Sequence, residues 1–204
     1  KWYYWIVFFM LYFLYFFIGH LLGDFLFQTT KIVIWKQKSL WGIFLHVLIL
    51  HISISFIFLP YLTEPLIWFV ILLNSILHFL TDWAKVSYER IFNPKNPIPA
   101  FWIDQVTHII TFAIIAMNLP HLEIGLFADS WWIEYYQQAY FLFYIIGFLF
   151  FSYMLDVSYF IHELGKGNFA PYSRSYYSMI VHTFFFACVF VLLWTVGRFY
   201  LGLF

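Results

Sequence analysis

The chain has 204 residues, is 64% hydrophobic and 10% charged, and carries no formal net charge at neutral pH. Soluble domains carry about a quarter charged residues, so these proportions exclude an ordinary soluble fold and indicate an all-α integral membrane protein. The balanced charge excludes the basic surface that a nucleic-acid partner would require, and the single cysteine, Cys188, excludes an intrachain disulfide and a cysteine-based zinc site.

Six apolar segments are expected to cross the bilayer as helices. A spanning helix needs about 20 mostly apolar residues. The first segment lacks the small-residue cleavage site of a signal peptide, so it is expected to be a retained helix. The expected spans are residues 2–27, 40–59, 65–86, 102–119, 140–160 and 176–201.

These spans are predicted to form one polytopic bundle with two parts. Residues 1–117 are expected to be a four-helix membrane core that holds a cluster of histidines and aspartates. Residues 118–204 are expected to add an interfacial loop and two further transmembrane helices. The loop contains DSWWIEYYQQ, 129–138, whose tryptophans and tyrosines favour the headgroup level of a membrane. Membrane lipids are therefore expected partners.

The charges of the loops alternate in sign along the chain. The loops after the first, third and fifth spans contain all the loop cations, whereas the charged residues of the other two loops are all acidic. The cations are Lys31, Lys36, Lys38, Arg90, Lys95, Lys166 and Arg174, and the acids are Glu64, Glu123, Asp129 and Glu134. Cytoplasmic loops are enriched in lysine and arginine. Both termini are thus predicted to lie on the non-cytoplasmic side.

Polar side chains recur on four helices at one predicted depth, near the cytoplasmic end. GHLLGDFLFQ, 19–28, ends the first span, and His46 lies about two turns into the second. HFLTDWAK, 78–85, ends the third span, and DQVTH, 104–108, begins the fourth. Ionisable residues inside a membrane are functional candidates by default.

Three His/Asp pairs at this depth are spaced four residues apart. Residues at this spacing share one helical face, about 5–6 Å apart at Cβ, so a pair can bind one metal ion or a carboxylate can orient a histidine ligand. With His46, the pairs provide four imidazoles and three carboxylates, which suit one or two divalent ions of zinc, manganese or iron. The predicted metal ligands are His20, Asp24, His46, His78, Asp82, Asp104 and His108.

A purely structural cluster is the alternative. Lys85 and protonated histidines could neutralise Asp24, Asp82 and Asp104 and lock the bundle without a metal. An aspartate at the membrane centre costs roughly 2.5–3.5 kcal/mol, so three at similar depth need compensation in either case. The threefold repetition of the His/Asp spacing favours the metal.

The motifs resemble those of a bacterial family of uncharacterised polytopic membrane proteins, a domain of unknown function of the 3307 type. The shared pattern is H-x-x-G-D-F-x-x-Q, a histidine on the next helix, H-x-x-x-D-x-x-K and D-Q-x-x-H, in this order over about residues 10–117. The resemblance implies no activity. On this chain the pattern falls on His20, Gly23, Asp24, Gln28, His46, His78, Asp82, Lys85, Asp104, Gln105 and His108.

The sequence predicts a multi-pass protein of the bacterial inner membrane with a His/Asp metal site at the cytoplasmic leaflet. If the protein is an enzyme, a metal-dependent hydrolase that activates water and acts on an amphiphilic substrate is favoured. The catalytic candidates are Asp24, Asp82, Asp104 and Lys85. The residues expected around the ligands are Gln28, Gln105 and His182, the last about two turns into the final span.

A non-catalytic accessory subunit is the alternative function. Aromatic residues make up 27% of the chain, which fits a surface that packs against other subunits of a larger membrane complex. The polar cluster would then only fix the bundle. An enzyme should be active when purified alone, whereas an accessory subunit should co-purify with its partners.

Overall fold

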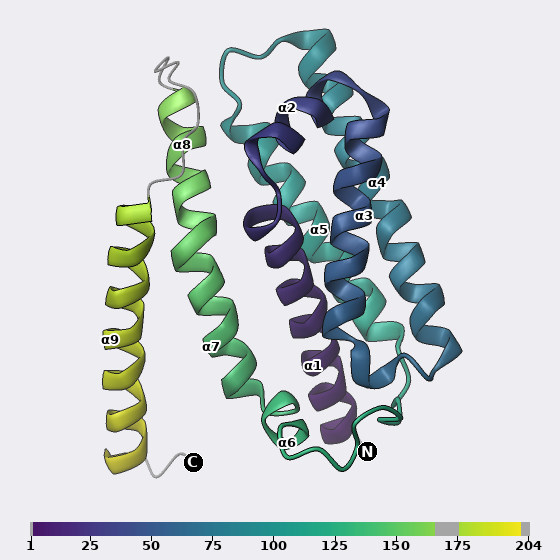
Figure 1. The fold of residues 1–204 in the computed structure, drawn as a ribbon, viewed down its shortest axis with the longest axis vertical. Helices are drawn as coiled ribbons and strands as arrows, with labels where there is room; N and C mark the ends of the chain where they lie inside the picture. Colours follow the sequence, from purple (N-terminus) through teal and green to yellow (C-terminus); the bar gives the residue numbers. More distant parts are fainter. Residues whose placement is uncertain (1, 166–175, 201–204) are drawn as a thin grey trace.

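The computed structural model describes residues 2–165 and 176–200, and every regular element in these ranges is helical (Figure 1). The predicted all-α class is therefore confirmed. In chain order the elements are α1 (Trp2–Leu21), η1 (Leu22–Leu26), α2 (Thr30–Lys38), α3 (Leu40–Ile57), η2 (Leu59–Tyr61), α4 (Pro65–Phe92), α5 (Ile98–Asn118), α6 (Ile133–Tyr136), α7 (Ala139–Leu149), η3 (Phe150–Met154), α8 (Leu155–Gly165) and α9 (Tyr176–Tyr200). Lys166 and Arg174, two of the predicted cytoplasmic cations, lie outside the described residues.

Five helical segments are long and apolar enough to cross a membrane, and they correspond to the first five predicted spans. They are Trp5–Leu26, Leu40–Ile57, Pro65–Phe92, Ile98–Asn118 and Ala139–Glu163. α9 is 25 residues long, and its apolar segment among the residues whose side chains the structure describes is Met179–Leu192. The described chain is thus of membrane type with five candidate spans, and the sixth stays a prediction.

The first predicted loop contains a helix that hydropathy did not predict. The hydroxyl of Thr29 accepts a hydrogen bond from Ile32 N (3.4 Å) at the start of α2, and the hydroxyl of Ser39 accepts one from Trp41 N (3.2 Å) at the start of α3. Serine and threonine favour helix starts because they satisfy such free amides. α2 has only nine residues and three lysines, so its composition resembles that of a charged loop.

The ends of α4 and α5 lie further out than the predicted boundaries at residues 86 and 102. α4 continues to Phe92 and is ended by Asn93, whose φ of 40° is the left-handed conformation that terminates helices. α5 begins at Ile98, with a proline in its first turn. The loop between them is therefore short, and it holds these two helix ends together.

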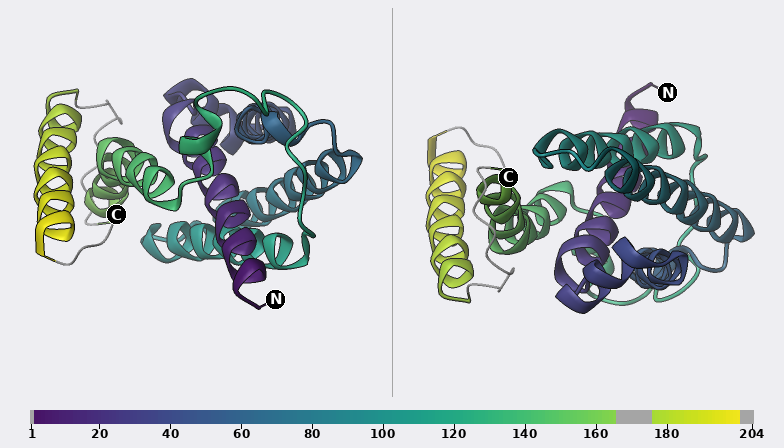
Figure 2. Two further views of the ribbon diagram at one scale, coloured as in Figure 1. Left: turned by 90° about the horizontal axis from the view of Figure 1, so that it is seen from below. Right: turned by 90° about the horizontal axis from the view of Figure 1, so that it is seen from above.

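The four helices α1, α3, α4 and α5 form one bundle, and α2 packs against α3 at one end of it (Figure 1). α7, η3 and α8 continue as one long helix, of which α7 packs against α1. α9 lies outside the bundle against α7 and η3, as the end-on views in Figure 2 show.

Buried tyrosines close the end of the bundle at which α1 begins. The Tyr15 hydroxyl donates to the Tyr136 carbonyl (3.0 Å), and the Tyr136 hydroxyl donates to the Ile57 carbonyl (2.8 Å). The Tyr12 hydroxyl accepts a hydrogen bond from the Leu122 amide (2.9 Å). Buried tyrosine hydroxyls need such partners, and these bonds tie the segment after α5 to α1 and α3.

α1 and its continuation η1 approach α3 closely at Gly19 and Gly23. A Cβ at Gly19 would lie 2.6 Å from Ile54 Cγ1 and 3.0 Å from Ile54 Cα, and a Cβ at Gly23 would lie 3.0 Å from Leu50 Cα. Small residues four positions apart allow helix backbones to pack closely in membranes. The residue after each glycine is one of the predicted ligands, so this contact also sets how far those ligands lie from α3.

Gly19→Val is expected to force α1 away from α3, because its Cβ would meet the Ile54 backbone, which cannot move aside. We expect this overpacking to lower the free energy of unfolding by about 1–3 kcal/mol, measured by chemical unfolding in detergent micelles. Ile52→Val, on the exposed face of α3, is the control. An unchanged free energy for Gly19→Val would contradict the close contact.

Candidate metal centre

Five helical elements, of which η1 continues α1, bring the seven predicted ligands and one predicted neighbour, Gln105, to a single buried cluster. All eight residues are at most 8% exposed, and His46 and Asp82 are fully buried. The cluster consists of His20 of α1, Asp24 of η1, His46 of α3, His78 and Asp82 of α4, and Asp104, Gln105 and His108 of α5.

Asp24 lies in a π-helical turn. In η1 the Phe27 amide donates to the Leu22 carbonyl (2.8 Å), one residue further back than in an α-helix. Such turns add a residue within a helix and are frequent at functional sites. Across this turn His20 Nδ1 lies 3.5 Å from Asp24 Oδ1, so the first His/Asp pair is in contact.

Asp24, His46 and His78 meet at the centre of the cluster. His46 Nε2 lies 3.1 Å from His78 Nε2 and 3.3 Å from Asp24 Oδ1, and His78 Nε2 lies 3.5 Å from the same Asp24 oxygen. Asp82 Oδ2 lies 3.4 Å from His46 Nε2 and 3.7 Å from His78 Nε2. Ligand atoms from three segments of the chain therefore converge. Two overlapping groups at this centre have ligand atoms within 4.8 Å of one another and could hold a metal ion, namely His20, Asp24 and His78, and His46, His78 and Asp82.

Two glutamines lie against the outer nitrogens of the histidines. Gln105 Nε2 donates to Asp104 Oδ2 (3.1 Å), so Gln105 Oε1 is left to accept the proton of His20 Nε2 at 3.2 Å. This tautomer leaves His20 Nδ1 unprotonated toward the cluster. The Gln28 amide donates its Nε2–H to His46 Nδ1 (3.1 Å), which leaves the proton of that ring on Nε2, toward the cluster. Metal-bound histidines usually donate their second N–H outward, so the Gln105 contact has the direction expected at a metal site and the Gln28 contact has the opposite direction.

A second set of ligand atoms adjoins the first. His108 Nε2 lies 3.3 Å from Asp104 Oδ1, and the His108 ring stacks on His78 with 3.9 Å between ring centroids. Atoms of Asp82, Asp104 and His108 lie within 4.8 Å of one another. The cluster therefore offers two adjoining sets of donors.

Lys36 also belongs to the cluster. From the sequence, this lysine was only one of the cations that indicate a cytoplasmic loop. Its ammonium donates to both carboxylate oxygens of Asp82, at 2.9 and 2.8 Å, and its side chain is 10% exposed. A lysine beside a membrane span carries no signal of such a role. Finding it would have required the position of α2.

Two contacts hold α2 where Lys36 can reach α4. A Cβ at Gly42 of α3 would lie 2.3 Å from the Trp35 carbonyl carbon, so α2 rests on the α3 backbone. The Arg90 guanidinium donates to the Gln37 carbonyl (2.8 Å), where a cation also suits the C-terminal end of the helix dipole. The position of Lys36 is thus set by backbone contacts of its own helix.

Two of the three buried aspartates have a lysine partner. Lys36 pairs with Asp82, and the Lys85 ammonium donates to Asp104 Oδ2 (3.0 Å). Burial alone would lower the pKa of Lys36, but Asp82 and, more weakly, Asp24 and Asp104 raise it above its ordinary value, so this lysine is charged. Within the described ranges Asp24 has no lysine or arginine at ion-pair distance, and its neighbours are imidazoles.

Several polar atoms of the cluster have no hydrogen-bond partner among the described residues. A buried polar atom without a partner costs roughly 1–3 kcal/mol, and imidazole nitrogens and carboxylate oxygens of this kind are the donors that zinc and similar ions take. The donor set therefore fits a transition-metal ion. The atoms are His20 Nδ1, Asp24 Oδ1, His78 Nδ1, Asp104 Oδ1 and His108 Nε2.

Asn74 is a further buried polar residue that the sequence did not single out. It lies one turn before His78 on α4, is fully buried, and has both amide atoms without a partner in the described part of the chain. Residues four apart share a helix face, so Asn74 extends the polar face of α4 deeper into the bundle. One asparagine in an apolar span forms no pattern that could have indicated this.

The structure does not bring His182 to the cluster. It lies on α9, which packs against α7 and η3 outside the bundle (Figure 2). Its Nδ1 has no hydrogen-bond partner among the described residues. His182 was expected near the cluster because it lies at the same predicted depth in the membrane as His46. Depth along the membrane normal does not determine which helices lie side by side.

The five candidate spans and the buried His/Asp cluster define an all-helical protein of membrane type whose cluster could hold a metal ion. Residues 12–134 match the family described as protein of unknown function (DUF3307), and the chain belongs to this family. The resemblance seen in the motifs is thus confirmed, and the match covers all predicted ligands. No curated protein and no solved structure matches the chain.

Lys36→Met is expected to leave Asp82 charged and buried without its partner. Removing one member of a buried ion pair costs about 3–5 kcal/mol, so the free energy of unfolding should fall by that amount in detergent with a chelator present. Lys38→Met, on the exposed side of the same helix, should change little. The double variant Lys36→Met/Asp82→Asn should recover most of the loss; a loss equal to that of Lys36→Met would contradict the pairing.

Proposed function

We propose that the protein is a metal-dependent hydrolase of the bacterial inner membrane that acts on an amphiphilic substrate. One divalent ion would be held by His46, His78 and Asp24, with Asp82 beside it. Asp24 lies at the end of its candidate span, and His46 and Asp104 lie about two turns into theirs, a depth that favours a substrate with an apolar chain and a polar head.

The spacing of three ligand atoms is the observation that carries this proposal. In a tetrahedral site with metal–ligand distances of about 2.0–2.1 Å, ligand atoms lie about 3.3 Å apart. The distances among Asp24 Oδ1, His46 Nε2 and His78 Nε2 are 3.1, 3.3 and 3.5 Å. These atoms match three corners of such a site, and two histidines with one carboxylate form a ligand set of catalytic zinc sites.

Asp82 adjoins the fourth corner. Its Oδ2 is near both imidazole nitrogens, but both of its oxygens also accept hydrogen bonds from Lys36. A carboxylate shared with an ammonium is a weaker metal ligand than Asp24. We therefore assign Asp82 to hold and deprotonate water at an open fourth position, because catalytic zinc sites keep one position open and structural sites fill all four.

The charges of the cluster favour one ion over two. Three buried aspartates face two lysines, which leaves one negative charge at Asp24. One divalent ion changes this excess to one positive charge, which an anionic substrate would neutralise. A second ion would add two more positive charges to a buried site, at a high desolvation cost. In this assignment Lys85, and not a metal, neutralises Asp104.

The ligand set narrows the choice among zinc, manganese and iron. Zinc takes imidazole and carboxylate in four-coordinate sites. Two histidines and one carboxylate also form the iron site of non-haem oxygenases, whereas manganese suits sites of six oxygens. Zinc and iron therefore fit better than manganese.

The chemistry proposed is attack of water on an ester. A bound ion of this type lowers the pKa of water to near neutrality. Asp82 would accept the proton of that water. The bond to the leaving oxygen of the ester would then break, and the proton would pass from Asp82 to that oxygen, so that an alcohol leaves. Lys36 would hold Asp82 in place. Lys85 and Gln28 would bind the negative charge that develops on the ester during the reaction, or an anionic group that the substrate already carries.

The second candidate is a non-catalytic accessory subunit whose polar cluster locks the bundle. The two lysine–aspartate pairs favour it, because they neutralise most of the buried charge without any metal. One protonated histidine beside Asp24 would complete the balance. The two functions differ in metal content and in whether the protein is stable and active alone.

The gently purified full chain is expected to contain about one equivalent of zinc or iron by elemental mass spectrometry. His46→Gln removes a ligand and should lower this content about tenfold or more. His51→Gln, on the same helix with its Nδ1 against the Ser75 hydroxyl (2.9 Å), should leave it unchanged. Asp82→Asn should keep the metal and lose ester hydrolysis.

Three outcomes would alter the assignment. Full metal content and full activity in Asp82→Asn would remove its main support. Two equivalents that fall to one in Asp104→Asn would replace the single ion with two. Absence of metal after purification without chelator, together with co-purifying membrane proteins, would favour the accessory subunit.

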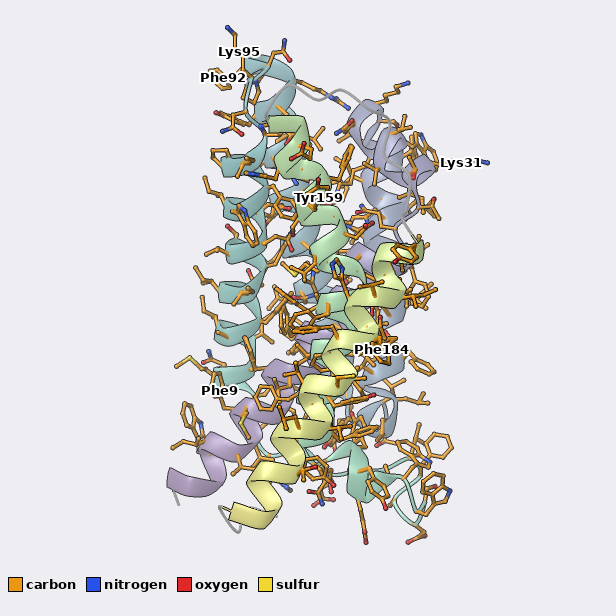
Figure 3. The ribbon with its side chains drawn as sticks, turned by 90° about the vertical axis from the view of Figure 1, so that its left-hand side faces the viewer. Phe9, Lys31, Phe92, Lys95, Tyr159 and Phe184 are labelled. Carbon is orange, nitrogen blue, oxygen red and sulfur yellow. The ribbon has the colours of Figure 1, made fainter. Side chains whose placement is uncertain are left out.

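We also propose six spans, the cluster at the cytoplasmic leaflet and both termini on the opposite side. The lysines and arginine at the cluster end support this orientation; Lys31 and Lys95 lie at one end in Figure 3. In a Cys188→Ser background, Lys31→Cys should react with an impermeant maleimide only from the cytoplasmic side of vesicles, and Asp129→Cys only from the other. The reverse pattern would invert the orientation.

A further inference from the structure

A cavity of about 390 Å³ lies between the cluster and α8. Its charged lining residues are Asp24, Lys36, Lys85 and Asp104 at the cluster, with Glu89 and Lys95 beyond them. α8 contributes apolar side chains from the opposite side, namely Val157, Phe160 and Ile161. Apolar walls with a few charged groups at one end are typical of small-molecule sites of this size.

The charged end of the cavity favours an anion once a divalent ion is bound. The three buried aspartates and Glu89 are then outweighed by Lys36, Lys85, Lys95 and the ion, and one positive charge is in excess. Lys85 has three N–H donors, of which one bonds to Asp104 Oδ2, and its side chain is 18% exposed. An ammonium at the cavity wall can therefore donate to a ligand while it stays paired.

A phosphate suits this charged end better than a carboxylate. Lys36, Lys85 and Lys95 line this space, and so does Asp24, which is a ligand of the proposed ion. A phosphate monoester offers three terminal oxygens to such a set, whereas a carboxylate offers only two. Lysines and metal ions are the usual partners of phosphoryl groups in enzymes.

The apolar side of the cavity favours a hydrocarbon chain on the same ligand. Val157, Phe160 and Ile161 belong to the candidate span Ala139–Glu163. They lie at the end of that span near the cluster, where α8 stands beside the bundle (Figure 1). A chain that leaves the charged end along α8 would pass directly into the lipid phase.

On the basis of the metal site proposed above, we propose that this cavity binds a phosphate-bearing amphiphile. The phosphoryl group lies at the charged end beside Lys85, and the hydrocarbon chain runs along Phe160 of α8 into the cytoplasmic leaflet. This assigns a substrate class to the site and a chain-binding role to the second half of the protein.

Binding is tested with the full chain, loaded with zinc in nonionic detergent micelles. The probes are dodecyl phosphate, inorganic phosphate and dodecyltrimethylammonium. Dodecyl phosphate should bind with a Kd at least about tenfold lower than that of inorganic phosphate, since burial of a chain adds apolar area. Dodecyltrimethylammonium should not bind. Equal binding of the two dodecyl probes would overturn the proposal.

Variants separate the chain from the head. Phe160→Ala should raise the Kd of dodecyl phosphate about tenfold and leave that of inorganic phosphate unchanged. Tyr159→Ala is the matched control, because Tyr159 is 68% exposed on the same helix (Figure 3). Lys85→Gln/Asp104→Asn removes a balanced pair, so folding is protected, and should raise the Kd of both phosphates about tenfold.

Metal content, measured on the same samples, distinguishes this proposal from the hydrolase. A sample with one equivalent of metal in which Phe160→Ala has no effect would overturn the cavity assignment and leave the metal site intact. A metal-free sample that binds dodecyl phosphate through Phe160 would support the chain-binding role of α8 and overturn both the hydrolase and the part of the ion in binding the phosphoryl group. A preference for dioleoyl phosphatidic acid or for a single-chain polyprenyl phosphate would support the proposal and identify which lipid supplies the head.

Discussion

The close contact between α1 and α3 is the constraint on which the cluster depends. Helices usually pack 8–10 Å apart, but Gly19 and Gly23 bring the backbones so close that a Cβ would meet the α3 main chain. Because His20 and Asp24 directly follow these glycines, Asp24 reaches His46 at 3.3 Å. Without that contact, the short Asp24 side chain could not join imidazoles from α3 and α4. The same two residues that tighten the bundle thus create the candidate metal centre.

Burial of three aspartates creates a charge problem that α2 only partly solves. α2 rests on Gly42 and delivers Lys36 to Asp82, while α4 supplies Lys85 for Asp104. Buried ion pairs are seldom more stable than apolar packing of the same volume, so stability alone is a weak reason for this arrangement. The two pairs leave Asp24 facing three imidazoles, and this is the place where a divalent ion would reverse the remaining negative charge. The lysines then set the charge of the site as well as the position of its carboxylates.

Hydropathy and spacing predicted the depth of the cluster but not its lateral arrangement. The ends of the spans and the four-residue His/Asp spacing were enough to bring His20, His46, His78 and His108 to one level, and the structure joins them. Lys36 was missed because its role depends on α2, a short helix without an apolar signature. His182 shared the predicted depth, yet α9 lies outside the bundle. Gly19 and Gly42 matter only through the helix that faces each of them, which one sequence does not reveal.

The long helix α7–η3–α8 explains how one end of the molecule can be closed and the other open. At the end where α1 begins, tyrosine hydrogen bonds tie the segment after α5 to α1 and α3, and α7 packs on α1. At the cluster end, α8 instead borders a cavity whose other side is charged. η3 interrupts this helix with a π-turn between the two regions, next to η1, which carries Asp24. π-turns are sites at which helices change direction. The two turns lie side by side where the tight packing of α7 on α1 ends and the cavity beside α8 begins.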